Sequence, residues 1–532
     1  MRCDNCQYPD QRVTESFGNP NADLMIIAEA PGKHEAIISG VPLTGTSGTV
    51  LDKTLEKVGI GLEECYLSNI INCRPPHNNT PTKEAISACS DRLYSEVRDV
   101  NPTTILSLGA TASKTILDTD KGINALRGMV YEQDGRYIIP TIHPGLCLQE
   151  GSTYFDFYFD IKKAKQALNG NFRNDTLDMS YRVVTEPNVL RNGIRWMNQY
   201  DEISVDVETT GLNWRECDLL QIGFGTEEDE AIIVDWDKTD DKQTMRALLN
   251  DFFQSDIDFV LHNGKYDYKV MAERENIYCP IDYDTLILHH IGLDERSGKK
   301  LRSLEKLSRQ FLNVSSWGDE LKEYMEDDEL TLRDADQDKV HEYLSKDVGA
   351  TLRLFNLFKE KIDSTGWNAY ELLIRPSIET VLEMEMNGMR VNKDHLQKLQ
   401  DKFEEEISEL EKDLQEIADE FGWDSEQYQE DTEAKSKPEY FNPNSDQQLW
   451  YVLYTLFDLP KYEGDETAKK EARNYFMDRL QNEDERYEFI DKLNKYKGKQ
   501  KLNNTYIKGM WKYVEGDRVY TKLNMAGSRS GR

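Results

Sequence analysis

The sequence lacks long apolar runs and any excess of basic residues. No stretch reaches the roughly 18 consecutive apolar residues of a membrane-spanning helix, and the start MRCDNCQYPDQR has no apolar signal segment. The formal net charge is -33, with 98 acidic and 65 basic side chains. These absences predict a soluble intracellular protein with no membrane partner. They also exclude attraction of DNA by the surface as a whole.

Cysteine is scarce as well, with 8 residues in 532. In a reducing cytoplasm, such cysteines are more often metal ligands or buried thiols than disulfides. Four stand singly and are expected to be core residues, namely Cys65, Cys147, Cys217 and Cys279. The other four have the spacing of metal ligands, and they are Cys3, Cys6, Cys73 and Cys89. Four thiolates suit a tetrahedral zinc ion and an iron-sulfur cluster equally well.

Three blocks follow one another along the chain. Residues 1–168 alternate short strands rich in Val, Ile and Leu with helical patterns, which predicts a parallel α/β sheet. A polar linker at 169–180 precedes a second α/β block at 181–365, and residues 366–532 carry mostly helical patterns. The predicted fold class is therefore multidomain α/β with a mainly helical last block.

The first block carries five motifs in a fixed order. They are AEAPGKHEA (28–36), GVPLTGTSGTVLD (40–52), LSNIINCRPPHNNTP (67–81), LGATA (108–112) and TIHPG (141–145). Together they resemble the family 4 uracil-DNA glycosylases. The resemblance implies a 4Fe-4S cluster held by the four cysteines with ligand-like spacing. This cluster would staple the N-terminus to a DNA-contacting loop and take no direct part in the chemistry.

The same resemblance implies roles for three residues near the ends of apolar strands. Asn69 would read the Watson–Crick edge of a flipped-out uracil, which cytosine would mismatch. Glu29 would orient water or stabilise positive charge on the sugar, and His143 would donate a hydrogen bond to the departing uracil anion. The chain departs from the family at Leu43, where Phe usually stacks on the base, and at Ala36. A non-catalytic uracil sensor or DNA clamp is therefore the alternative for this block.

The second block places carboxylates at positions typical of a divalent-metal site. Asp206 and Glu208 are two apart on a predicted strand, so their side chains share one face. Tyr343 and Asp347 are four apart and share a helical face, and Asp267 lies between these two pairs in the sequence. Clustered carboxylates repel one another unless hard cations neutralise them. The pattern therefore predicts a metal-dependent catalytic site.

This pattern resembles the proofreading 3′-5′ exonucleases of the DEDD class, in the subtype with Tyr in the third motif. The resemblance covers the whole second block and implies a ribonuclease H-like fold with two Mg²⁺ or Mn²⁺ ions. Asp206, Glu208 and Asp347 would be direct ligands. Asp267 would act mainly through water, and Tyr343 would orient the attacking water.

The third block resembles, in order, the segments that open the polymerase region of family A DNA polymerases. These segments are RPSIETVLEMEMNGMRVNKDHL (375–396), FNPNSDQQLWYVLYTLFDLP (441–460) and LNNTYIKGMWKYVEGDRVYTKLNMAGSRSGR (502–532). The resemblance implies a thumb, with no match to the palm carboxylates or the fingers. Residues 402–439 are expected to form an acidic helix and an acidic tail loop, and KLNKYKGKQKLNNTY (492–506) a basic stripe for duplex phosphates.

The three blocks together predict the N-terminal portion of a replicative family A DNA polymerase from a bacteriophage. We expect it in the cytoplasm of an infected bacterial host. The expected partners are single-stranded 3′ ends, primer-template duplex and uracil-containing DNA. For the missing match to the palm, three explanations stay open: an engineered fragment, a gene interrupted by an intron or intein, or a split polymerase with a complementary polymerase chain as a further partner. The alternative is a stand-alone DNA repair protein that combines glycosylase and exonuclease.

Overall fold

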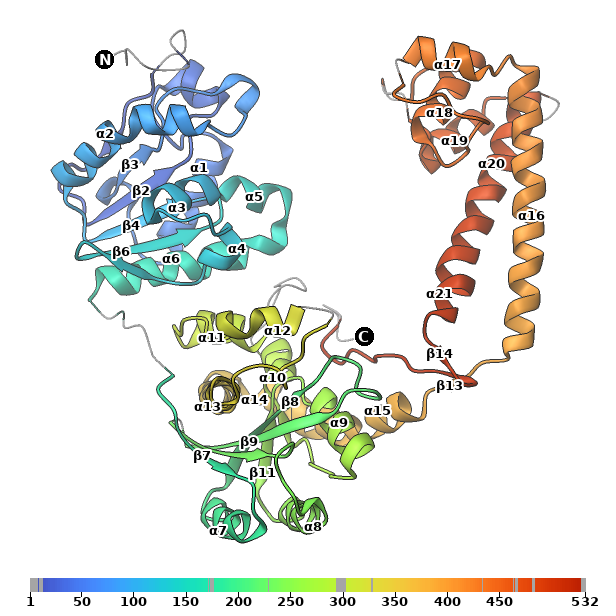
Figure 1. The fold of residues 1–532 in the computed structure, drawn as a ribbon. Helices are drawn as coiled ribbons and strands as arrows, with labels where there is room; N and C mark the ends of the chain where they lie inside the picture. Colours follow the sequence, from blue (N-terminus) through green and yellow to red (C-terminus); the bar gives the residue numbers. More distant parts are fainter. Residues whose placement is uncertain are drawn as a thin grey trace. The chain divides into compact units, whose positions relative to one another are not determined.

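The computed structural model divides the protein into two compact units. The residues it describes are 8, 13–170, 172, 177–227, 229–292, 303–326, 329–432, 434–462, 464, 467–480 and 484–527. One unit is residues 1–382 with 524–532, and the other is residues 383–523. The first contains two α/β domains and the second is mainly helical (Figure 1). None of the described helices has the length and apolar character needed to cross a membrane.

The first domain is built on a six-stranded sheet of order β1-β3-β2-β4-β6-β5. Its strands are β1 Phe17–Gly18, β2 Leu24–Ala28, β3 Tyr66–Asn69, β4 Thr104–Leu108, β5 Tyr131–Gln133 and β6 Arg136–Thr141. Its helices are α1 Thr46–Lys57, α2 Lys83–Val100, α3 Ala110–Leu117, α4 Ile123–Leu126, α5 Pro144–Gln149 and α6 Tyr154–Leu168. The four inner strands, β3, β2, β4 and β6, are parallel, so their carboxyl ends meet at one edge.

Alternating residues of β2 bury both faces of this sheet. Leu24 and Ile26 pack with residues of α1 and α6, whereas Met25 and Ile27 pack with residues of α2 and α3. Near-continuous apolar strands of this kind are typical of parallel sheets covered by helices on both sides. The result is a three-layer α/β/α domain.

The second domain contains a mixed six-stranded sheet of order β12-β11-β8-β9-β10-β7. Its strands are β7 Ser180–Val184, β8 Glu202–Thr209, β9 Leu219–Glu227, β10 Glu230–Asp235, β11 Asp258–Leu261 and β12 Tyr283–Asp284. Its helices are α7 Pro187–Met197, α8 Lys242–Phe252, α9 Lys265–Glu275, α10 Thr285–Gly292, α11 Leu304–Phe311, α12 Lys322–Glu326, α13 Gln337–Lys361, α14 Ser364–Ala369 and α15 Arg375–Asn387.

Strand β8 separates the core of this domain from its functional face. Ile203 and Val205 join the apolar core formed with α7 and α8. The residues between them face the other way, where the Ser204 hydroxyl donates to the carbonyl of Val348 on α13 at 2.7 Å. Helix α13 therefore lies against the face of the sheet to which Asp206 and Glu208 belong by the period of two.

The second unit consists of a long helical pair, a small helical cluster and a short sheet (Figure 1). Its elements are β13 Met389–Arg390, α16 Lys393–Glu420, α17 Ser425–Thr432, α18 Asp446–Trp450, α19 Lys470–Met477, α20 Glu485–Leu502, α21 Lys508–Trp511, β14 Val514–Glu515 and β15 Arg518–Val519. Gly388 has φ +60° between α15 and β13, and a Cβ there would lie 2.8 Å from the carbonyl oxygen of Val519. Only glycine suits that turn without strain.

This architecture confirms the predicted fold class of two α/β domains followed by a mainly helical region. One local expectation was wrong. Within the acidic segment at 402–439, the part expected to be a tail loop contains helix α17, whose Tyr428 is buried against Trp423 and Tyr451. Aromatic burial stabilises a helix there despite the acidic composition.

Candidate functional site

The predicted glycosylase residues all lie at the carboxyl edge of the first sheet. Asn69 ends β3, Glu29 follows β2, and His143 lies two residues after β6. Strand β4 lies between β2 and β6 in the sheet, and Gly109 follows it. Gly109 has φ +91°, and a Cβ there would approach the Cβ of His143 to 3.4 Å. The parallel topology thus brings these functional groups to one edge, where ligands bind in open α/β sheets.

Asn69 is buried, with 1% of its surface exposed. Its side-chain nitrogen has no hydrogen-bond partner within the part of the chain that the structure describes. Leaving a buried amide unpaired costs about 1–3 kcal/mol, so such a group needs an explanation. A hydrogen-bonding ligand at this edge would supply the missing partner.

His143 caps the N-terminus of α5. Its Nδ1 accepts a hydrogen bond from the backbone N–H of Gly145 at 3.1 Å. Burial lowers the pKa of His143, so the ring is neutral at neutral pH. Because Nδ1 is the acceptor, the proton of the neutral ring lies on Nε2, which is therefore the donor.

Leu43 has an unusual conformation for a position expected to contact a base. Its φ is +55° and its side chain, 7% exposed, packs in the core cluster with Leu51 and Leu55. The backbone at Gly48 lies so close that a Cβ there would overlap the carbonyl oxygen of Leu43. Leu43 therefore offers little apolar surface to a flipped base.

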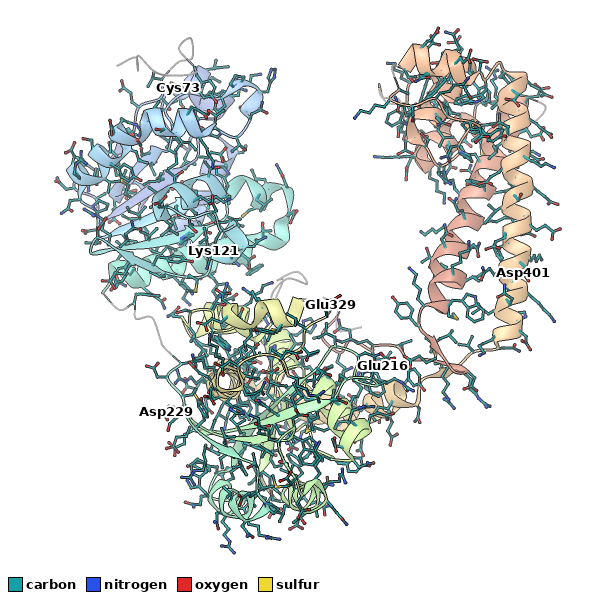
Figure 2. All side chains as sticks on the ribbon, viewed as in Figure 1. Cys73, Lys121, Glu216, Asp229, Glu329 and Asp401 are labelled. Atoms are coloured by element: carbon teal, nitrogen blue, oxygen red, sulfur yellow. The ribbon has the colours of Figure 1, made fainter. Side chains whose placement is uncertain are left out.

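Two of the four expected cluster cysteines lie in the described part of the chain. Cys73 (labelled in Figure 2) follows β3 and is 9% exposed, and Cys89 lies on α2 and is 6% exposed. Cys3 and Cys6 lie outside the described residues. Val13 forms an antiparallel bridge with Cys73, and Tyr8 packs against the core cluster that contains Cys89. Two described residues that follow the N-terminal pair in the sequence therefore lie near the described thiols.

The predicted exonuclease residues come from three elements. Asp206 and Glu208 lie on β8, Asp267 on the first turn of α9, and Tyr343 with Asp347 on α13. Glu208, Asp267 and Asp347 are 8%, 4% and 7% exposed. The structure thus gathers into one buried cluster side chains that are up to 141 positions apart in the sequence.

Burial raises the pKa of all four carboxyl groups, and their mutual charges raise it further for Glu208, Asp267 and Asp347. Asp206 and Asp267 are joined by a hydrogen bond that favours the proton on Asp267. Among the described residues, no three His, Cys, Asp or Glu side chains converge closely enough to form a ready metal site. The donor set is nonetheless all oxygen, and a divalent cation would neutralise the mutual charges that raise the pKa of these carboxyl groups.

Trp317 was not predicted from the sequence. Its indole Nε1–H donates to Oδ1 of Asp347 at 2.7 Å. The neighbouring Gly318 lies against the ring of Tyr343, where a Cβ would come within 2.9 Å of Cε2. The stretch NVSSWGDEL carries no motif, and only the fold reveals that its tryptophan contacts a carboxylate predicted to be catalytic.

Leu212 was also missed. It follows β8 and is 90% exposed, the highest exposed fraction of any large apolar residue in the described part of the chain. Its turn is fixed because the hydroxyl of Tyr266 donates to the carbonyl of Gly211 at 2.6 Å and contacts the Thr209 hydroxyl at 2.8 Å. The turn therefore holds an apolar side chain in solvent four residues after Glu208.

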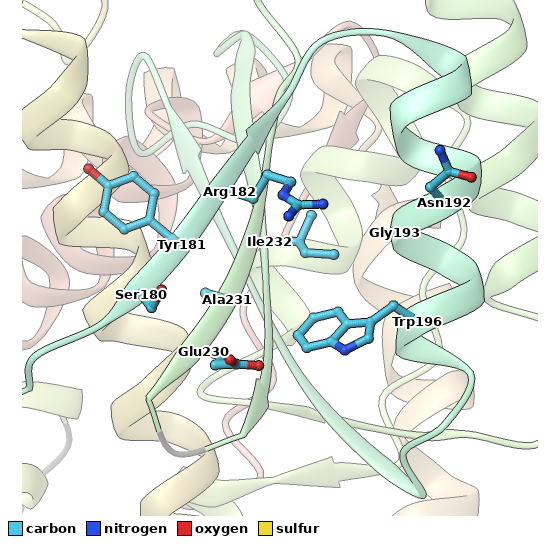
Figure 3. A pocket seen from close by; sticks show the side chains of 9 residues that line it. All are labelled: Ser180, Tyr181, Arg182, Asn192, Gly193, Trp196, Glu230, Ala231 and Ile232. Carbon is cyan, nitrogen blue, oxygen red and sulfur yellow. The ribbon is translucent and has the colours of Figure 1, made fainter.

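A cavity of about 390 Å³ lies elsewhere on this domain (Figure 3). Residues of β7, α7 and β10 line it, among them Arg182, Trp196 and Glu230. None of the clustered carboxylates belongs to it. This cavity is therefore separate from the candidate active site.

Three of the five lysines at 492–501 form ion pairs, two of them with carboxylates of α16. Lys492 pairs with Asp413, and Lys499 pairs with Glu406 at 2.5 Å. Lys495 pairs with Asp491 within α20. The expected basic stripe is thus much weaker than its sequence indicates.

Models of three known families match separate parts of the chain. The Uracil DNA glycosylase superfamily matches residues 15–163, the 3′-5′ exonuclease family residues 181–363, and DNA polymerase family A residues 393–532. These matches confirm the three resemblances expected from the motifs. The chain is therefore related to family A DNA polymerases and carries exonuclease and glycosylase-like domains.

Comparisons with individual proteins give more specific relationships. The chain is 35% identical to the type-4 uracil-DNA glycosylase of Thermotoga maritima over 170 residues, which cover 31% of this chain and 88% of the relative. Through that region the chain belongs to the type-4 uracil-DNA glycosylase family. It is also homologous to the DNA polymerase of Bacillus phage SP01, with 24% identity over 439 residues. That match covers 75% of this chain but only 47% of the phage protein.

One solved structure aligns with two thirds of the chain. The polymerase domain of Pol1 from M. smegmatis, in complex with DNA primer-template and dNTP, gives a TM-score of 0.48 and 18% identity. The alignment covers 66% of this chain and 54% of that chain. This likeness is too weak to assign a fold or a function.

Proposed function

We propose that the chain is the N-terminal portion of a viral replicative DNA polymerase, with proofreading exonuclease and uracil-DNA glycosylase-like domains. Its substrates are single-stranded 3′ ends, primer-template duplex and uracil-containing DNA, in the cytoplasm of an infected bacterium. The homology to a phage DNA polymerase over 439 residues is the observation that carries this proposal.

The buried carboxylate cluster supports exonuclease activity. Asp206, Glu208 and Asp347 would hold two Mg²⁺ or Mn²⁺ ions, with Asp267 acting through water. When bound, such ions stabilise charge on the attacking and leaving oxygens of a phosphodiester. The charge of Asp347, followed by burial, raises the pKa of Tyr343, so its hydroxyl keeps the proton with which it orients the attacking water.

Leu212 gives this site a surface for the terminal nucleotide. Bases unstack from a duplex end and then need an apolar or aromatic surface to rest on. A 90% exposed leucine after the strand of the catalytic carboxylates offers that surface. We propose that it contacts the terminal base while the carboxylates act on the adjacent phosphate.

The first domain supports binding of an extruded uracil. The unpartnered amide of Asn69 would pair with the base, and the Nε2–H of His143 would donate to it as it leaves. Glu29 would orient the water. Cys3, Cys6, Cys73 and Cys89 would hold a 4Fe-4S cluster, which has a structural role.

A second candidate for this domain is a non-catalytic uracil sensor or DNA clamp. The observation that favours it is Leu43, which is buried in the core and offers a base no flat surface. Loss of base stacking weakens capture by about 1–3 kcal/mol. Excision by the parent chain is therefore expected to be weak.

One experiment tests both activities. Purified protein is incubated with uracil-containing single strands in EDTA and in Mg²⁺, and the products are resolved with and without alkali. We expect shortening from the 3′ end only in Mg²⁺, and alkali-labile abasic sites in EDTA, because glycosidic cleavage needs no metal. Shortening that persists in EDTA contradicts the metal-dependent site. Uracil-specific binding without any abasic sites, in the parent and in Leu43→Phe, establishes the sensor in place of the glycosylase.

A further inference from the structure

Arg92 on α2 clamps the end of the strand that presents Asn69. Its Nη2 donates to the backbone carbonyl oxygens of Asn69 and Ile70, both at 2.7 Å. Its Nη1 donates to the hydroxyl of Ser68 at 3.0 Å and to Oε2 of Glu96 at 3.0 Å. One guanidinium therefore contacts three consecutive residues around the base-reading position.

The guanidinium is itself held in place. Glu96 lies one helical turn after Arg92, and its Oε2 also accepts hydrogen bonds from the hydroxyls of Ser68 at 2.6 Å and Ser16 at 2.9 Å. The side chains of Arg92 and Glu96 are 27% and 19% exposed, so water competes little with these contacts. Cys89, three residues earlier on α2, is buried against the sheet. The clamp thus rests on a helix that is fixed in the core.

The clamped segment is held from the sheet as well. The N–H of Ile70 donates to the carbonyl of Ala28 at 2.8 Å, and the N–H of Ile71 donates to the carbonyl of Glu29 at 3.3 Å. The side-chain nitrogen of Asn69 has no hydrogen-bond partner in the described chain, so the backbone and its packing determine where it points. Because Arg92 holds the carbonyls of Asn69 and Ile70 from the side of α2, it contributes to the direction in which that amide points.

We propose that Arg92 is a positioning residue for the amide of Asn69 and thereby sets the preference of this site for uracil over cytosine. This inference rests on the proposed uracil-binding function. Uracil and cytosine differ in the donor and acceptor that they present to one amide, so a misaligned amide loses discrimination more than it loses affinity. Lysine cannot replace the fork, because Nη2 binds the two carbonyls while Nη1 binds Ser68 and Glu96, and an ammonium has a single nitrogen.

The test measures binding of the full chain to short fluorescent single strands by anisotropy, in EDTA to silence the exonuclease. Each strand contains one 2′-fluoro-2′-deoxyuridine or one 2′-fluoro-2′-deoxycytidine. The fluorine destabilises positive charge on the sugar and prevents excision, so binding is measured whether or not the domain is catalytic. The variants are Arg92→Met, Arg92→Lys and the control Arg98→Met. Arg98 lies on the same helix, and within the described residues its guanidinium hydrogen-bonds only to the hydroxyl of Ser95, at 3.3 Å.

We expect the uracil-to-cytosine affinity ratio to fall about tenfold or more in Arg92→Met, because small misplacements of a binding group have effects of that size. Arg92→Lys is expected to be intermediate and Arg98→Met unchanged. Circular dichroism and Mg²⁺-dependent exonuclease activity serve as folding controls. If Arg92→Met fails to fold, the uracil-to-cytosine affinity ratio of Arg92→Lys serves as the test in its place.

The outcomes separate this inference from the function on which it rests. A parent chain without any preference for uracil overturns the proposed uracil binding itself. A parent that prefers uracil, with the same ratio in both Arg92 variants, overturns the positioning role alone. Equal loss of affinity for both strands also overturns it, because that result shows a purely structural role.

Discussion

Replacing Trp317 with Phe should weaken the exonuclease without unfolding it. The substitution removes the indole N–H that donates to Asp347 at 2.7 Å and keeps an aromatic ring in the half-buried site beside Val314 and Ala350. A hydrogen bond to a charged group contributes about 1.5–3 kcal/mol. Loss of that bond therefore corresponds to a factor of about 10 to 150. The expected effect is a rise of that order in the Mg²⁺ concentration that gives half-maximal rate, because a freely rotating Asp347 is a poorer ligand.

The assay follows release of 3′-terminal nucleotides over a Mg²⁺ titration. Trp196→Phe is the matched control, since Trp196 lines the cavity of Figure 3 and belongs to α7. In an Asp347→Asn background, Trp317→Phe should have little further effect, because the acceptor charge is already lost. A Trp317→Phe enzyme with an unchanged Mg²⁺ requirement refutes the reasoning. So does an equal defect in Trp196→Phe.

Three further predictions follow from the two α/β domains. The double substitution Asp206→Ala with Glu208→Ala should abolish nucleotide release in the same assay, whereas Tyr343→Phe should be milder because it leaves every carboxylate in place; a fully active double variant would place the chemistry elsewhere. Cys73→Ser should remove iron and sulfide and lower the thermal midpoint of the first domain. Exonuclease activity should persist, since the apolar cores of the two domains share no described residue. Loss of exonuclease activity together with the cluster contradicts this prediction. Burial lowers the pKa of His143, so the unfolding free energy of the first domain should fall as the pH drops below 6.5, the ordinary pKa of histidine. Denaturant titrations at several pH values should show that His143→Gln removes part of this fall. An unchanged dependence of the unfolding free energy on pH counts against a buried neutral ring.

Sequence patterns predicted the fold well because the four inner strands of the first domain are short, largely apolar runs with distinct ends. The motifs fall on those ends, as with Asn69 at the end of β3 and Gly109 at the start of the turn after β4. The period of two along β8 likewise predicted that Asp206 and Glu208 share a face. Features that depend on local periodicity were therefore accessible without a structure.

Features that depend on distant partners were not accessible. Arg92 and Trp317 are functional candidates only because the fold brings them to Asn69 and Asp347, which lie 23 and 30 positions away. Helix α17 was missed because its acidic composition conceals the aromatic packing of Tyr428. Local sequence carries no signal for such contacts.

The pairing of α20 lysines with α16 carboxylates has a consequence for how the second unit would hold DNA. Of the five lysines between positions 492 and 501, only Lys497 and Lys501 make no ion pair within the described residues. Lysines that are already neutralised displace no condensed cations from a phosphate backbone. Duplex bound along this helix would thus release about two counterions, giving a slope of about −2 in a plot of log affinity against log salt. Between 50 and 200 mM salt, binding by this helix would weaken about tenfold, whereas five unpaired lysines would give a loss of about 500-fold.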